Sequence, residues 1–243
     1  MNTIRWLNKH WLQLTVHVGA LAPLTLLIWD FTQDNLTFNP IQEITLRTGK
    51  VALILLVMTL ACTPLHTVLG WKRILSLRKP LGLYAFLYAS LHFLVFVGLD
   101  YTFDPVLIGQ AIIEKRYVLL GLAALLLLTP LAITSTRGWM RRLGKNWKRL
   151  HRLVYLAGIL AVLHYVWLVK SDIREPFVYG AGLAVLLILR LPPVRRAVSR
   201  LHHRRAAMHT PQPKQLCASS NVVPCRLSTK LRMMRRRPPC TRR

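Results

Sequence analysis

Residues 145–170 read KNWKRLHRLVYLAGILAVLHYVWLVK, an apolar stretch that begins in a basic cluster and contains two histidines, His151 and His164. A second apolar stretch, residues 81–99, reads LGLYAFLYASLHFLVFVGL and contains His92. Each approaches the length of about 20 residues that an α-helix needs to cross a bilayer. Because imidazole is costly inside hydrocarbon, histidines in such segments indicate a functional site.

The rest of the chain repeats this pattern of apolar blocks separated by charged loops. Its 243 residues are 53% hydrophobic and carry a formal net charge of +26. The first block follows Arg5 and Lys9, as the apolar core of a signal peptide would, but it continues to Trp29, which favours an uncleaved span. The sequence predicts an all-α, polytopic membrane bundle with six transmembrane helices, at about residues 11–29, 49–69, 81–99, 117–135, 150–169 and 177–191.

The charged loops predict the orientation of the bundle. Basic residues cluster before the first span, between spans two and three, between spans four and five, and after span six. Because cytoplasmic loops carry the excess of Lys and Arg, both termini are expected in the cytoplasm. Topology and attraction to anionic lipid explain these clusters without nucleic acid as a partner. The acids lie in the alternate loops: Asp30, Asp34, Glu43, Asp100, Asp104, Glu114, Asp172 and Glu175.

The last part of the chain has a different composition. Residues 1–200 form the predicted six-span domain, whereas residues 201–243 are rich in Arg, Pro and Ser and lack a long apolar run. Such composition predicts a basic, disordered cytoplasmic tail. Cys217, Cys225 and Cys240 lack the paired spacing of zinc sites and are expected to be free thiols.

The predicted topology places two histidines at similar depth. Spans three and five run in the same direction, with His92 about eleven residues and His164 about fourteen residues from the cytoplasmic edge. Two neutral imidazoles at one depth on parallel helices can bind one iron from opposite sides. Each could instead be a packing residue that hydrogen-bonds a neighbouring helix.

His151 lies about 20 Å below His164 by the rise of an α-helix, at the cytoplasmic edge. That separation suits a second redox group, with His17 or His66 as a candidate partner, and an interfacial role is the alternative. On an ideal helix His151 and His164 point about 140° apart, so His151 is expected at the helix entrance.

Four segments together resemble a known family. They are residues 134–172, TSTRGWMRRLGKNWKRLHRLVYLAGILAVLHYVWLVKSD; residues 14–24, LTVHVGALAPL; residues 63–65, TPL; and residues 81–92, LGLYAFLYASLH. They are similar to the MsrQ family, formerly YedZ, within the ferric-reductase-like transmembrane group. The resemblance covers about residues 5–200 in motif order, spacing and predicted topology.

This resemblance implies an electron-transfer subunit, without a substrate site of its own, in a methionine sulfoxide reductase system of the bacterial inner membrane. Electrons would come from the quinol pool or a cytoplasmic flavin reductase and pass through haem b. They would reach the periplasmic molybdoenzyme MsrP, which reduces methionine sulfoxide in proteins. FMN is also attributed to the family, and no residue here is assigned to it.

The resemblance also bears on the number of haems. In the wider group, spans three and five each donate two histidines and hold two haems. Here His92 and His164 match one pair, but Arg78 stands about fourteen residues before His92. His151 therefore lacks its usual partner, with His17 as a candidate, and the chain is expected to hold one or two haems.

Two other functions are compatible with the sequence. A ferric or other metal reductase would keep the same fold and haem pair and accept electrons from outside. A metal or proton transporter would use the histidines directly, but no paired acids lie within the predicted spans. The chain has no G-x-G-x-x-G motif after a strand, so it is not expected to bind its own NADPH or FAD in the usual way.

Overall fold

The computed structural model describes residues 2–169, 174–191 and 194. These residues belong to the first of two units, Met1–His202 and His203–Arg243. The predicted tail of residues 201–243 and its cysteines lie outside the described residues, so the division at residue 200 stays a prediction. The described residues form helices joined by short loops and turns, without a β-strand among them.

Five segments are long and apolar enough to cross a membrane, as the sequence predicts for the first five spans. They are Trp11–Thr32, Pro40–Leu69, Arg73–Asp100, Arg116–Ile133 and Lys145–Leu168. The sixth predicted span corresponds to α9 (Arg174–Ile188), which has 15 residues. At 1.5 Å per residue it is about 22 Å long, less than the roughly 30 Å of a hydrocarbon core. An all-α membrane bundle is confirmed, whereas the sixth span and the cytoplasmic termini stay predictions.

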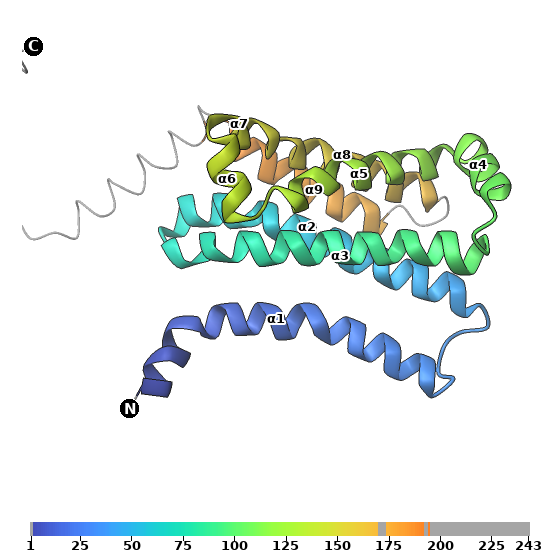
Figure 1. The fold of residues 1–243 in the computed structure, drawn as a ribbon, viewed down its shortest axis with the longest axis horizontal. Helices are drawn as coiled ribbons and strands as arrows, with labels where there is room; N and C mark the ends of the chain where they lie inside the picture. Colours follow the sequence, from blue (N-terminus) through green and yellow to red (C-terminus); the bar gives the residue numbers. More distant parts are fainter. Residues whose placement is uncertain (1, 170–173, 192–193, 195–243) are drawn as a thin grey trace, which may run out of the picture. The chain divides into compact units, whose positions relative to one another are not determined.

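Two helix pairs form the centre of the bundle (Figure 1). In the first, α2 (Pro40–Leu69) packs along α3 (Arg78–Val95); in the second, α5 (Arg116–Ile133) packs along α8 (Leu153–Leu168). Contacts between α3 and α5 join the two pairs, and α9 packs on α8. The first helix, α1 (Asn2–Thr32), drawn in dark blue in Figure 1, contacts α2 and α3.

Local signals explain where α2 begins and ends. Asn39 caps its first turn by accepting a hydrogen bond from the backbone N–H of Gln42, and Pro40 occupies the first helical position. Gly70 ends the helix in the left-handed region, with φ of 68°, where glycine carries no steric penalty. A 3₁₀ helix, η1 (Lys72–Leu77), then leads into α3.

The connection after α3 was expected only as an acidic loop and is more structured than that. A π-helical turn, η2 (Phe96–Asp100), extends α3, and α4 (Pro105–Glu114) follows it. Asp104 caps α4 by accepting hydrogen bonds from the N–H groups of Val106 and Leu107. Two short helices, α6 (Arg137–Leu143) and α7 (Lys145–Leu150), connect α5 to α8 at the opposite end of the bundle.

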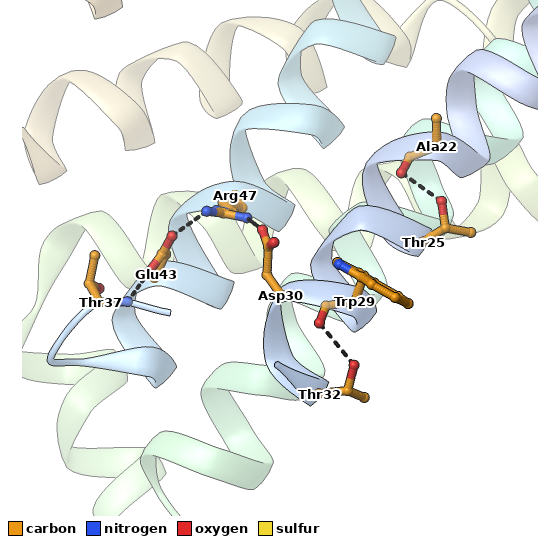
Figure 2. A network of polar contacts seen from close by, with 8 residues as sticks. All are labelled: Ala22, Thr25, Trp29, Asp30, Thr32, Thr37, Glu43 and Arg47. Atoms are coloured by element: carbon orange, nitrogen blue, oxygen red, sulfur yellow. Dashed lines mark hydrogen bonds and ion pairs between the residues drawn. The ribbon is translucent and has the colours of Figure 1, made fainter. Parts of the chain in front are cut away.

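A polar network joins α1 and α2 at the end where α4 lies (Figure 2). Arg47 on α2 bridges two carboxylates, Asp30 on α1 and Glu43 on its own helix. Glu43 also accepts a hydrogen bond of 2.6 Å from the backbone N–H of Thr37 in the connecting loop. The network fixes the loop between the first two helices.

The seam between α1 and α3 depends on one buried hydrogen bond. The Tyr88 hydroxyl, 2% exposed, donates to the Ala20 carbonyl at 2.6 Å. Tyr88→Phe removes this buried hydrogen bond between helices and should therefore lower the free energy of unfolding by about 1 kcal/mol. Titration with SDS in mixed micelles measures this. Tyr84→Phe, which loses a bond to the exposed His17, should cost less; equal losses would contradict this account.

Candidate functional site

The structure brings His92 of α3 and His164 of α8 together in the bundle. Their ring centroids are 6.0 Å apart and the ring planes are nearly perpendicular, at 84°. Both side chains line a cavity of about 800 Å³ between the two helix pairs. The predicted match in depth therefore corresponds to a direct juxtaposition of the two rings.

A backbone carbonyl holds each of the two rings. The Nδ1 atom of His92 lies 2.8 Å from the Thr45 carbonyl oxygen, and that of His164 lies 2.6 Å from the Tyr117 carbonyl oxygen. Since a carbonyl only accepts hydrogen bonds, each Nδ1 must carry the proton and donate. The lone pair on each Nε2 is then free to bind a metal, and the anchored proton increases its basicity.

The separation of the rings fits one metal ion between them. Histidine nitrogen binds a transition metal at about 2 Å, so two imidazoles on opposite sides of one ion have centroids about 6 Å apart. The observed distance between the centroids of the His92 and His164 rings, 6.0 Å, agrees with this separation. A haem held by two histidines needs only these two nitrogens from the protein, because its porphyrin supplies the other four ligands of the iron. The site therefore fits a bis-histidine haem.

Two glycines, which the sequence reasoning missed, let the rings lie against α2 and α5. A Cβ atom at Gly49 would stand 3.0 Å from the His92 ring, and one at Gly121 would stand 2.9 Å from the His164 ring. At such distances a side chain would fit only if the histidine ring moved away. Gly49 and Gly121 thus contribute to the site because they have no side chain, which lets the histidine rings approach α2 and α5 closely.

The sequence did carry a signal for these glycines, as an internal repeat. His92 is 47 residues after Thr45, and His164 is 47 residues after Tyr117. Gly49 and Gly121 each precede their histidine by 43 residues. The α2–α3 and α5–α8 pairs therefore repeat the same spacing of carbonyl, glycine and histidine, and each pair contributes one anchored histidine.

The cavity is polar at one end only. Far from α4 it is lined by apolar side chains that include Leu56, Ala85 and Leu128. The other end, which we call the mouth, is lined by the polar side chains of Asn39, Gln42, Lys50, Asp100 and Lys115. A ligand with one apolar edge and one acidic edge matches this division.

The structure does not place His151 in this cavity. The helix is interrupted by a turn at His151 and Arg152, between α7 and α8, as expected for a residue at the helix entrance. Its ring packs against the Trp147 ring, with centroids 4.0 Å apart. The positive charge of Arg78 lies close enough to influence the ring electrostatically. The ideal-helix angle between His151 and His164 therefore does not apply.

His17 also lies apart from the pair. Its Nδ1 atom is 2.9 Å from the Tyr84 hydroxyl, and its side chain is exposed on α1. His17 thus bridges α1 to α3. A role for it as partner of His151 stays a prediction.

Comparisons with known proteins agree with this geometry. Residues 48–162 match the model of the family described as "Ferric reductase like transmembrane component". This range contains Gly49, His92, Gly121 and His151 and ends two residues before His164.

Three relatives are each named "Protein-methionine-sulfoxide reductase heme-binding subunit MsrQ". The protein of Xanthomonas axonopodis pv. citri is 52% identical over 178 residues, which cover 71% of this chain and 82% of the relative. That of Xanthomonas oryzae pv. oryzae is 48% identical over 206 residues, 82% and 92% of the two chains. That of Rhodospirillum rubrum is 46% identical over 186 residues, 76% and 89% of the two chains.

Proposed function

Since the chain belongs to the MsrQ family of ferric-reductase-like haem-binding subunits, we propose that it conducts electrons across a bacterial inner membrane through a haem b held by His92 and His164. The observation that carries this proposal is the pair of anchored imidazoles, 6.0 Å apart in one cavity. Bound haem supplies a reversible one-electron couple at its iron.

The residues of the chain would set how that couple operates. His92 and His164 would hold the haem iron through their Nε2 atoms, and a haem held by two histidines would suit electron transfer rather than substrate binding. The carbonyls of Thr45 and Tyr117 fix the ring orientations and favour the oxidised iron by strengthening the imidazole donors. The apolar walls exclude water from the cavity.

The predicted orientation gives the electron path a direction. The mouth then faces the periplasm, where the acceptor is the molybdoenzyme MsrP, which repairs methionine sulfoxide in periplasmic proteins. His151 lies toward the cytoplasmic end, where a quinol or a cytoplasmic flavin reductase would deliver electrons. It is a candidate ligand of a second haem, and His17 is its candidate partner. FMN stays without an assigned residue.

A reduced-minus-oxidised spectrum of the purified protein, with the haem-to-protein ratio, tests the proposal. We expect a low-spin b-type spectrum and one haem per chain from the His92–His164 site, or two if His151 also binds one. If protein made under haem-sufficient conditions contained no haem, the proposal would be contradicted and a metal or proton transporter would be favoured instead.

The description of the matching family model favours a second candidate, a ferric or metal reductase. The two candidates share the haem pair and differ in the acceptor. Membranes that contain the protein and an electron donor should reduce methionine sulfoxide when MsrP is added. Reduction of Fe(III) chelates, with no transfer to MsrP, would favour the second candidate.

A further inference from the structure

The polarity of the cavity orients an amphipathic ligand within it. A haem carries both of its propionate carboxylates on one edge, and the rest of its rim is apolar. A buried carboxylate is costly unless it is paired or hydrogen-bonded. Because the polar lining residues gather at the mouth and the opposite end is lined by Leu56, Ala85 and Leu128, the propionate edge belongs at the mouth.

Two lysines line the mouth, and they differ in what they already bind. Lys50 forms an ion pair with Glu175, with Nζ 2.7 Å from a carboxylate oxygen. Lys115 instead donates a hydrogen bond of 2.8 Å to the neutral hydroxyl of Tyr101. Among the ion pairs of the described residues, none includes Lys115. Lys115 therefore offers the mouth a positive charge without a bound counter-ion.

We infer that Lys115, held in place by its hydrogen bond to the Tyr101 hydroxyl, binds a haem propionate at the mouth of the cavity. This inference rests on the haem site proposed above. Tyr101 does not itself line the cavity, so its role is to position Lys115. Its hydroxyl accepts one hydrogen bond from the Lys115 ammonium group, which has further N–H donors for a carboxylate.

Tyr101 is held in place for this role. Its ring lies 4.7 Å from the ring of Phe96, which lines the cavity, and its backbone N–H donates to the Phe96 carbonyl. The next two residues, Thr102 and Phe103, have φ of 47° and 58°. Such left-handed conformations are rare outside glycine and persist where the surroundings fix them, often at ligand clamps.

The electrostatics at the mouth also suit an incoming anion. The hydrogen bond to Tyr101 raises the pKa of Lys115, so the ammonium form is present at neutral pH. Asp100 is the carboxylate that lines the mouth, and among the ion pairs of the described residues none joins it to Lys115. Lys115 is therefore not engaged in an ion pair with the carboxylate of the cavity lining.

The test compares protohaem with its dimethyl ester, which lacks both propionate charges. The full chain, made without haem in a haem-deficient host, is titrated with each compound in membranes. Lys115→Gln should bind protohaem about tenfold more weakly, the effect of one charged hydrogen bond, and bind the ester as before. Tyr101→Phe should show a smaller loss of the same kind. In purified holoprotein, Lys115→Gln should also lower the midpoint potential, because a nearby cation favours the reduced iron.

Arg116→Gln is the matched control, because it removes a neighbouring positive charge that does not line the cavity. It should leave both affinities and the potential unchanged. The inference would be overturned if the unaltered chain bound protohaem and its dimethyl ester equally. It would also be overturned if Lys115→Gln kept the same preference for protohaem over the ester. Either result would leave the haem site itself intact. Failure of the unaltered chain to bind either compound would instead overturn the proposed function.

Discussion

Replacing His164 with alanine is expected to abolish haem binding at the His92–His164 site. The change removes one of two axial ligands and also leaves the Tyr117 carbonyl without its hydrogen bond. Loss of a group that only orients a metal ligand costs roughly 10- to 100-fold in affinity, so loss of the ligand itself should cost more. The low-spin spectrum of this haem should disappear from the purified protein. His92→Ala should have the same effect, because the two histidines hold equivalent positions in the internal repeat.

The control for this experiment is His66→Ala, which removes a half-buried histidine of α2 that does not line the cavity. It should keep the spectrum of the haem at the His92–His164 site. Imidazole added to His164→Gly should restore a low-spin haem if the variant is folded and only the ligand is missing. A full spectrum in His164→Ala would show that the iron is bound elsewhere.

The sequence was sufficient for the parts of this fold that depend on local composition. Apolar length predicted six spans, of which five are long enough to cross a membrane, and the depth of His92 and His164 on parallel helices predicted that they could share one iron, in agreement with the closeness of their rings. Both follow from helix rise and bilayer thickness, which need no knowledge of packing. The length of α9 was less predictable, because residues 177–191 are apolar enough for a span while the helix ends at Ile188.

The parts that escaped sequence reasoning depend on contacts between helices. Gly49 and Gly121 are ordinary residues in apolar helices until the neighbouring histidine ring is placed against them. The hydrogen bond between Lys115 and Tyr101 joins the residue before α5 to the residue after η2. These two residues flank α4, a helix in a segment that the sequence predicted only as an acidic loop. Comparing the chain with itself would have shown the equal spacings, whereas the contacts required the structure.

Adding one methyl group at Gly121 is therefore expected to weaken haem binding although no ligand is changed. In Gly121→Ala the new Cβ would stand 2.9 Å from the His164 ring, and that ring is held by a hydrogen bond of 2.6 Å to the Tyr117 carbonyl. The ring cannot move away without lengthening this bond or turning its Nε2 from the iron. Because disturbing the orientation of a ligand costs roughly 10- to 100-fold in affinity, haem content should fall and the midpoint potential should shift.

Gly49→Ala should have a smaller effect of the same kind. Its Cβ would stand 3.0 Å from the His92 ring, and a small movement of the ring would relieve this contact. Gly182→Ala in α9 is the control, since its Cβ would meet nothing within 4 Å. Alanine there should be neutral or stabilise the helix by up to about 1 kcal/mol. Titration of each variant with protohaem measures the order of affinities, Gly182→Ala above Gly49→Ala above Gly121→Ala. Unchanged affinity in Gly121→Ala would mean that the His164 ring is free to move, and the close approach of α5 would then have no part in holding the haem.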